Sequence, residues 1–146
     1  GIIYHGSAQN FRAQLIATSD SVDLALLRVL VRGGVPVVRG LAETGRTGDP
    51  VAIAGFPLGL DSTLTGDWRR TGVAAAIGTG TIVGADPGLL TLDGYGAGGS
   101  SGSPLFDAAG LVAGVLFGGD PASGGRVVYA VPARHIGELL RKAGVR

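Results

Sequence analysis

Apolar residues along this chain fall into short runs that glycine, proline and aspartate interrupt, and only one stretch near the C-terminal end has helical spacing. Residues 11–18 alternate between apolar and other side chains, which is the period of a half-buried strand. Runs rich in apolar or β-branched residues predict further strands at 22–30, 51–55, 71–83, 89–92, 104–106, 111–117 and 126–131. Many short strands separated by turn residues predict an all-β fold, a sandwich or a barrel.

The helical pattern lies at the C-terminal end. Pro132 stands at the first position of the predicted helix, where its missing N–H costs nothing, and Gly144 closes the helix. One apolar stripe runs along it, made of Ile136, Leu139, Leu140 and Ala143. Residues 60–70 predict a polar surface loop, and Asp86-Pro87-Gly88 predicts a hairpin turn. The whole chain, residues 1–146, is predicted to be one domain.

Composition and charge argue against several classes of protein. With 45% hydrophobic and 16% charged residues the chain is too apolar to be disordered, and no apolar run reaches the ~18 residues of a membrane span. A net charge of +1 with scattered basic residues argues against a nucleic-acid surface. The absence of cysteine excludes disulfides and thiolate chemistry, and two histidines far apart in sequence argue against a zinc site. We therefore expect no metal and no organic cofactor.

A glycine- and serine-rich segment, Gly98–Leu105, lies between two predicted strands and carries the candidate chemistry. A serine hydroxyl becomes a nucleophile only beside a positioned base, and attack on a carbonyl needs donors for the oxyanion. Backbone N–H groups converge most easily in a glycine-rich turn. Ser101 is the candidate nucleophile, with the N–H groups of Gly99 and Ser101 as oxyanion donors. The alternative is a flexible surface loop, which is the more common role of such clusters.

An acidic residue interrupts a second apolar segment, Ser21–Leu27. Asp23 is costly to bury there unless its carboxylate is paired. In a catalytic triad a buried carboxylate orients the histidine and stabilises its cation. An aspartate that caps a turn at a strand edge explains the same residue, and the pattern leaves both interpretations open.

Taken together, these segments resemble trypsin-like serine proteases of the bacterial HtrA-like kind. Gly98–Leu105 is similar to their nucleophile motif Gly-Asx-Ser-Gly-Gly-Pro-Leu, and Asp23–Leu27 is similar to the segment Asp-[Leu/Ile/Val]-Ala-Leu-Leu around the triad aspartate. Shorter segments resemble other family motifs in the same order, namely Gly55–Leu60, Thr79–Val83, Gly110–Val115 and Tyr129–Pro132. The similar segments run from Phe11 to Gly144, which is nearly the whole chain.

The resemblance implies a trypsin-like double β-barrel with the active site in the cleft between the barrels. Residues 1–60 would form part of the N-terminal barrel, truncated so that its first strands are missing. Residues 71–131 would form the C-terminal barrel and residues 132–144 the C-terminal helix. The implied activity is that of a serine endopeptidase acting on polypeptides, with Ser101 as nucleophile and Asp23 as the acid that orients the histidine.

The resemblance also assigns the substrate-binding residues. Val115, Leu116 and Phe117 would pair with an extended substrate as an added strand. Tyr95 would lie near the base of the first specificity pocket. Because no aspartate or lysine stands there, we expect a preference for small or medium apolar side chains.

The general base is the main departure from the family. There the histidine precedes the aspartate by two or more strands, in a Thr-x-x-His-Val-Val-like segment. Here only His5 precedes Asp23, with room for one strand between them. We expect the catalytic histidine upstream of Gly1, with His5 an ordinary loop residue; His5 as the base is the alternative. His135 has no family role and is expected to be a solvated helix residue.

Two serines in the nucleophile loop are smaller departures. Ser100 replaces the usual Asp or Asn before the nucleophile, and Ser103 replaces a glycine two residues after it. A serine is tolerable in place of that glycine only where the backbone does not need a positive φ. Either change could loosen the oxyanion turn.

Three functions remain open from the sequence. The first is a serine endopeptidase that is active as the full-length protein. The second is a non-catalytic protease-like domain that binds peptides or partners in the cleft. The third, a β-sandwich adhesion or sugar-binding module, explains the strands but not the Asp23 and Ser101 segments together.

Two expectations about the surroundings of the protein follow. Missing first strands would leave exposed strand edges, so we expect a homo-oligomer or a strand-complementing partner chain to cover them. The family resemblance alone suggests an exported, cell-envelope or periplasmic location in a bacterium.

Overall fold

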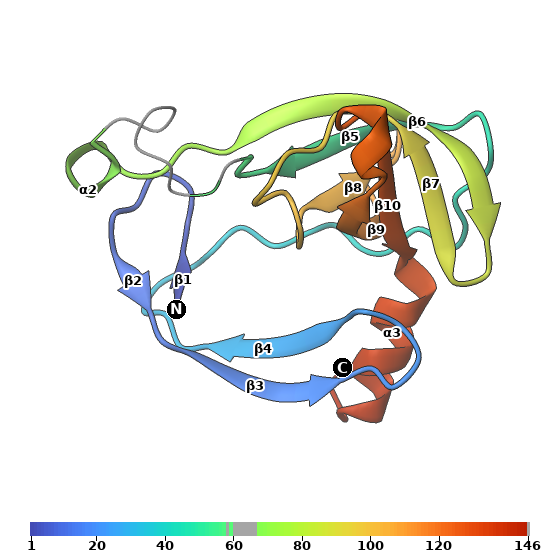
Figure 1. The fold of residues 1–146 in the computed structure, drawn as a ribbon. Coiled ribbons are helices and arrows are strands. Elements are labelled where there is room, and N and C mark those ends of the chain that lie inside the picture. The colour runs from blue at the N-terminus through green and yellow to red at the C-terminus, as the bar shows by residue number, and fades with distance from the viewer. Residues whose placement is uncertain (58, 60–66, 146) are drawn as a thin grey trace.

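The computed structural model describes residues 1–57, 59 and 67–145 (Figure 1). Strands make up most of it, as predicted. They are β1 (Ile2–Ile3), β2 (Asn10–Phe11), β3 (Ala13–Thr18), β4 (Ala25–Val29), β5 (Pro50–Gly55), β6 (Ala76–Asp86), β7 (Leu89–Asp93), β8 (Pro104–Phe106), β9 (Val112–Gly119) and β10 (Val127–Pro132). The helical elements are α2 (Trp68–Thr71), the 3-10 helix η1 (Pro121–Ser123) and α3 (Ala133–Lys142).

Six strands form a closed antiparallel barrel in the order β10, β7, β6, β5, β8, β9. The hairpin between β6 and β7 turns after Asp86, which pairs with Leu89, where the sequence predicts a turn. The barrel is filled by side chains that are at most 2% exposed, among them Ile82, Leu90, Leu92, Leu105 and Ala130. Burial of this apolar surface is the main stabilising contribution to the barrel.

The pairing of β9 with β10 depends on a glycine. A Cβ at Gly114 would lie 2.7 Å from the carbonyl oxygen of Val131 on the neighbouring strand. Only a residue without a side chain lets the two backbones approach this closely. This pairing fixes the position of the following residues of β9, which reach the site described below.

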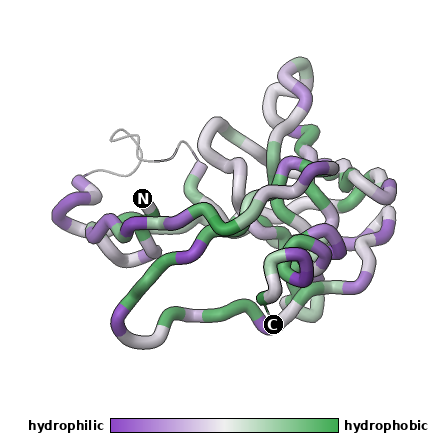
Figure 2. Tube along the Cα trace, turned by 90° about the horizontal axis from the view of Figure 1, so that it is seen from below, coloured by the Kyte–Doolittle hydropathy of each residue, from purple (hydrophilic) through white to green (hydrophobic). Residues whose placement is uncertain are grey.

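The N-terminal strands lie outside the barrel, in two separate two-stranded sheets, β1–β2 and β3–β4. Figure 1 shows β3 and β4 side by side below the barrel, with their connecting turn beside α3. Leu15 of β3 pairs with Leu27 of β4, and these side chains are 59% and 47% exposed. Figure 2 shows hydrophobic stretches, in green, along segments at the periphery of the molecule as well as in its middle. The described residues therefore form one closed barrel and two small sheets outside it.

Three element boundaries differ from the sequence predictions. The sequence prediction places residues up to 60 in the N-terminal half, but β5 pairs with β6 and β8 inside the barrel. It lies there because its buried Val51 and Ile53 complete the barrel core. The strand predicted from residue 71 begins at Ala76, since Val73 instead bridges to His5. The loop predicted at 60–70 falls largely outside the described residues, and its last part is helical, in α2.

The terminal helix α3 follows Pro132, as predicted, and packs against the barrel through the buried residues Ala133 and Leu139. Gly144 has a φ of 67°, a left-handed conformation that ends the helix, and its N–H donates to the carbonyl of Arg141. The helix thereby brings the apolar stripe predicted from the sequence between the barrel and the β3–β4 sheet.

Candidate active site

The glycine- and serine-rich loop is held by hydrogen bonds at both ends. Ser100 N–H donates to the carbonyl of Ala97 at 3.0 Å, and Gly102 N–H donates to the carbonyl of Leu116 at 2.8 Å. Gly99 and Gly102 have φ values of 88° and 90°, in the left-handed region that favours glycine. The loop is therefore a turn that backbone hydrogen bonds anchor to the neighbouring segments.

Ser101 lies at the exposed edge of this turn. Its Oγ donates a hydrogen bond to the carbonyl of Phe117 at 3.2 Å. The N–H groups of Gly99 and Ser101 have no recorded acceptor among the described residues, and both residues are exposed. Two free backbone donors beside an exposed hydroxyl are the elements that an oxyanion site requires.

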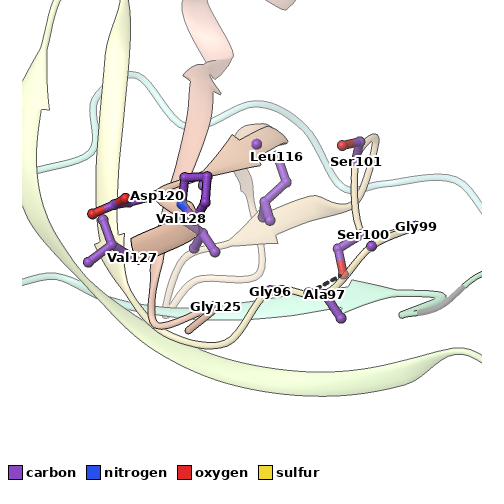
Figure 3. A pocket seen from close by; sticks show the side chains of 14 residues that line it. Gly96, Ala97, Gly99, Ser100, Ser101, Leu116, Asp120, Gly125, Val127 and Val128 are labelled. Carbon is purple, nitrogen blue, oxygen red and sulfur yellow. Dashed lines mark hydrogen bonds between the residues drawn. The ribbon is translucent and has the colours of Figure 1, made fainter. Parts of the chain in front are cut away.

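The two unusual serines of the loop are both buried. Ser100 is 8% exposed, and its Oγ accepts the Ala97 N–H at 3.2 Å (Figure 3). Ser103 is 5% exposed and lies against Gly55, where a Cβ would come within 2.9 Å of the Ser103 Cβ. The Ser100 hydroxyl thus closes the turn, and the Ser103 side chain fills the space that Gly55 leaves.

A pocket of about 270 Å³ opens beside this turn (Figure 3). One wall is the turn itself, and the other comes from β9, β10 and the loop between them; the lining residues outside the turn are Leu116, Gly118, Gly119, Asp120, Pro121, Gly125, Val127 and Val128. Glycines let the walls pack closely on β10, because a Cβ at Gly96 or Gly119 would collide with Val128 or the Val127 carbonyl. The apolar walls and modest volume suit a small or medium apolar side chain.

Two residues near this pocket lie differently from the sequence expectation. Tyr95 is 66% exposed and does not line the pocket. Asp120 does line it, although no acidic residue was expected there. The Asp120 Oδ1 accepts the Ala122 N–H at 2.9 Å, and in Figure 3 the carboxylate points away from Ser101. Asp120 therefore caps the short helix η1 and leaves the part of the pocket near Ser101 uncharged.

Asp23 and Ser101 line one larger pocket of about 660 Å³. Its walls come from the start of β4, the middle of β9 and one face of α3, and its other lining residues are Ile2, Leu24, Ala25, Leu26, Leu27, Gly102, Val115, Leu116, Phe117, Ile136, Leu139 and Leu140. The fold thus brings the two candidate residues, which are far apart in sequence, to the same apolar pocket.

The surroundings of Asp23 differ from the expected buried, paired carboxylate. Asp23 is exposed and lies in the turn that leads into β4. No hydrogen bond or ion pair to its carboxylate is recorded among residues 1–57, 59 and 67–145. The β3–β4 sheet is not covered by further described strands, which is the physical reason that the carboxylate stays open to solvent.

The three β9 residues predicted to bind substrate all line this larger pocket. Val115 pairs with Pro104 and Val131, so its backbone is fixed between two barrel strands. Leu116 lines both pockets. Phe117 stacks on Tyr129 with ring centroids 6.3 Å apart, and its carbonyl accepts the Ser101 hydroxyl. This part of β9 therefore connects the nucleophile loop to both pockets.

Neither histidine lies at the site. The Nδ1 of His5 accepts the Ala75 N–H at 3.0 Å, and His5 lines neither pocket. His135 was expected to be solvated, but its side chain is only 13% exposed, because α3 packs it against the β6–β7 turn. Its Nδ1 is 2.8 Å from a Glu138 carboxylate oxygen, and its Nε2 is 2.9 Å from the Pro87 carbonyl oxygen. Neither of the two pockets is thus lined by a histidine among the described residues.

The described residues also bear on metal binding and on membrane spans. No group of three or more histidine, cysteine, aspartate or glutamate side chains in these ranges is arranged to hold a metal ion. Within the part of the chain that the structure describes, no helix is both long and apolar enough to cross a membrane.

The far wall of the smaller pocket was not predicted from the sequence. Asp120, Val127 and Val128 face the nucleophile loop only because β10 pairs with both β9 and β7. Their local sequence predicts a glycine-rich loop followed by a strand, but it does not predict that this loop and strand face the Gly98–Leu105 segment. A strand-pairing prediction would have been needed to find them.

Known proteins show the same fold and family. The family model of the trypsin-like peptidase domain matches residues 4–115, and the chain belongs to this family. A probable periplasmic serine endoprotease, DegP-like, of Brucella suis is 31% identical over 141 residues, which cover 91% of this chain and 26% of that protein. Serine protease Rv3671c of Mycobacterium tuberculosis is 34% identical over 135 residues, covering 88% of this chain and 33% of that protein.

The solved structures agree. The crystal structure of the Rv3671c protease in its active form has a TM-score of 0.69 and 26% identity, and the match covers 93% of this chain and 60% of that one. The resemblance to HtrA-like bacterial serine proteases and the trypsin-like fold are thereby confirmed. The chain spans only 26% and 33% of the lengths of the two curated relatives named above.

Proposed function

We propose that the full-length protein is an HtrA-like serine endopeptidase that hydrolyses peptide bonds through an acyl-enzyme. Ser101 is the nucleophile, Asp23 is the acid that orients the base, and the N–H groups of Gly99 and Ser101 bind the oxyanion. The observation that carries the proposal is that Ser101 and Asp23 line one pocket, while two N–H groups without recorded acceptors flank the same turn.

The reaction follows from these positions. The base removes the proton from the Ser101 Oγ as the oxygen attacks the substrate carbonyl carbon. The negative charge that develops on the carbonyl oxygen is stabilised by the N–H groups of Gly99 and Ser101. Collapse of the tetrahedral intermediate breaks the C–N bond, and the base returns its proton to the leaving amine. Water then attacks the acyl-enzyme by the same route and releases the second product.

The base is proposed to be a histidine supplied from outside these 146 residues. Neither His5 nor His135 lines the pocket that contains Ser101 and Asp23, and both ring systems are engaged elsewhere. An imidazole placed in this pocket could contact the open Asp23 carboxylate and the Ser101 hydroxyl together. Its arrival would also give Asp23 the partner that the described residues do not provide.

Substrate binding is proposed to use β9 and the smaller pocket. An extended polypeptide would contact the Val115–Phe117 segment mainly through side chains and at Phe117, because the backbones of Val115 and Leu116 are already paired with neighbouring barrel residues. Its side chain before the scissile bond would enter the pocket of about 270 Å³. The apolar walls at Leu116 and Val128 favour small or medium apolar side chains. Tyr95, being exposed, is proposed to act at the outer part of this region rather than at the pocket floor.

Location and partners are proposed on coarser grounds. Relatives of this chain are named periplasmic serine endoproteases, and we propose an exported or cell-envelope location. The exposed Leu15–Leu27 pair on the isolated β3–β4 sheet supports a strand-complementing chain or a second copy as a partner.

A degradation assay on the full-length protein tests the proposed function. An unfolded polypeptide substrate should be cleaved by the wild type and not by Ser101→Ala. Thr47→Ala removes an exposed hydroxyl outside both pockets and should leave cleavage unchanged. Cleavage that survives Ser101→Ala would contradict the assignment of the nucleophile. Peptide binding without any cleavage by the wild type would favour a non-catalytic binding domain.

A further inference from the structure

An ion pair joins the turn that carries Asp23 to the last turn of α3. The Lys142 Nζ donates to the Asp20 Oδ2 at 2.5 Å. Asp20 lies between β3 and β4, three residues before Asp23, and Lys142 is the last residue of α3. Figure 1 shows this turn beside the helix. The pair therefore connects the β3–β4 sheet to the helix that is packed on the barrel.

Hydrogen bonds within the turn hold Asp20 and Asp23 in one closed segment. Ser19 N–H donates to the carbonyl of Leu24 at 2.9 Å, which closes the turn across its base. The Ser19 Oγ also accepts the N–H groups of Ser21 and Val22, both at 3.3 Å. Because Asp20 and Asp23 lie within this closed segment, a restraint on Asp20 is transmitted to Asp23.

Few other described contacts hold this sheet to the rest of the molecule. β3 and β4 pair only with each other, and a two-stranded sheet alone is at best marginally stable in water. The α3 side of the contact is firm, because Leu139 is buried and the helix packs on the barrel. The Asp20–Lys142 pair is consequently the polar tie between a loosely held sheet and a fixed helix.

We propose that Asp20 and Lys142 are positioning residues that hold the catalytic acid Asp23 at its working distance from Ser101. The proposal rests on the proposed function of Asp23 and adds the element that places it. Ile136, Leu139 and Leu140 of the same helix line the pocket that contains Asp23 and Ser101. One face of the helix thus forms a wall of the pocket, and its last residue, Lys142, holds the turn that carries Asp23.

The role follows from geometry rather than from stability. The two side chains are 83% and 55% exposed, and exposed ion pairs add little to folding stability. Catalysis is far more sensitive, because a misplacement of about 1 Å at a distance from the chemistry can cost about a hundredfold in rate. Breaking the pair should therefore lower kcat while leaving the fold and the specificity pocket unchanged.

The contact itself can be tested chemically, because Lys142 is the single lysine among these residues. A carbodiimide activates a carboxylate, and attack by a neighbouring amine forms an amide and releases the urea. The full-length protein should give a cross-linked peptide joining Asp20 to Lys142. Lys142→Arg keeps the charge but forms no such amide, so it is the matched control. Cross-links from Lys142 only to Glu138 would overturn the contact.

The positioning role is tested by kinetics of the full-length protein. Lys142→Asp and Asp20→Lys should each lower kcat about tenfold or more with little change in KM. The charge-swapped double variant Asp20→Lys/Lys142→Asp should recover kcat to within about threefold of the wild type. Lys142→Arg keeps the charge and should also stay within about threefold of the wild type. Arg70→Asp breaks the exposed Arg70–Asp67 pair outside both pockets and should leave kcat unchanged.

The outcomes separate this proposal from the proposed function. If the wild type is active and both charge reversals keep wild-type kcat, the positioning role is wrong and the proposed function stands. A charge swap that fails to recover kcat would also contradict a role for the ion pair. If the wild type cleaves nothing, the proposed function fails and the positioning role fails with it, while the Asp20–Lys142 cross-link still reports whether the contact exists.

Discussion

The Oγ of Ser103 occupies the space that a side chain at Gly55 would need. Gly55 ends β5, Ser103 precedes β8, and a Cβ added at Gly55 would overlap this hydroxyl and lie 2.9 Å from the Ser103 Cβ. The two positions are therefore complementary in size. The serine that departs from the family motif is accommodated because its neighbour has no side chain.

This complementarity predicts the effect of Gly55→Ala. Because Ser103 is 5% exposed and cannot move into solvent, the added methyl should destabilise the fold by about 1–3 kcal/mol, the usual cost of overpacking. Urea unfolding of the two proteins measures the difference. The double variant Gly55→Ala/Ser103→Gly should recover most of the loss. Equal unfolding midpoints for Gly55→Ala and the wild type would show that the contact is not tight.

The open Asp23 carboxylate predicts chemical rescue by imidazole. If the base is all that these 146 residues lack, free imidazole should enter the larger pocket and accelerate hydrolysis of an activated ester. The acceleration should saturate with imidazole concentration and disappear in Ser101→Ala. A stopped assay with a chromogenic ester measures it. An equal acceleration in both proteins would mean that imidazole acts in solution and that the site is not ready for a base.

Val128 is predicted to limit the size of the accepted side chain. It lines the smaller pocket, and its Cγ1 lies 2.5 Å from where a Cβ at Gly96 would stand. Val128→Ala should deepen the pocket and raise the kcat/KM ratio of a leucine-type over an alanine-type substrate by about tenfold, because a methylene in such a pocket contributes about 1–3 kcal/mol. Paired peptide substrates measure this ratio in the full-length protein. An unchanged ratio would place the specificity pocket elsewhere.

The Asp20–Lys142 pair predicts a pH dependence of stability. The hydrogen bond and the charge of Lys142 lower the pKa of the Asp20 carboxyl below its usual value of 3.8. The folded state therefore binds the proton less tightly than the unfolded state. The stabilisation is fully present above the unfolded pKa and is lost as the pH falls through the folded pKa.

Thermal unfolding of wild type and Asp20→Asn tests this sign. The difference in Tm should be larger at neutral pH than at about pH 3, and salt should reduce it because both side chains are exposed. Glu138 and His135 line the same small pocket as Asp20 and Lys142. Glu138→Gln is therefore the control background. In it, the substitution Asp20→Asn should still give a Tm difference that is larger at neutral pH than at about pH 3. A difference that grows on acidification would contradict the pairing.

The strands and the terminal helix were predictable because local patterns determine them. Alternation over residues 11–18 and the stripe around Leu139 each specify an element whatever the tertiary context. The exposed Leu15 and Leu27 show the limit, since an apolar pattern predicts a face to be covered but not what covers it. The placement of β5 in the barrel depended on its pairing with β6 and β8, which its own residues do not encode.

The candidate site was predictable where a backbone conformation demands a particular residue. The turn conformation of the candidate loop was predictable because left-handed backbone at Gly99 and Gly102 favours glycine; the role of Ser101 in it stays a prediction. The Asp120 and Val128 wall and the Lys142 contact could not be found in this way, because each depends on which elements meet in three dimensions. His135 was misjudged for the same reason, since its two partners come from its own helix and from a distant turn.

The central claim, that Ser101 is an activated nucleophile, is tested most directly by a serine-directed fluorophosphonate. The full-length protein should be labelled on a single serine, and mass spectrometry of the peptides should place the label on Ser101. Ser101→Ala should remove the label, while Thr47→Ala should retain it. No labelling of the wild type, or labelling that survives Ser101→Ala, would contradict the claim.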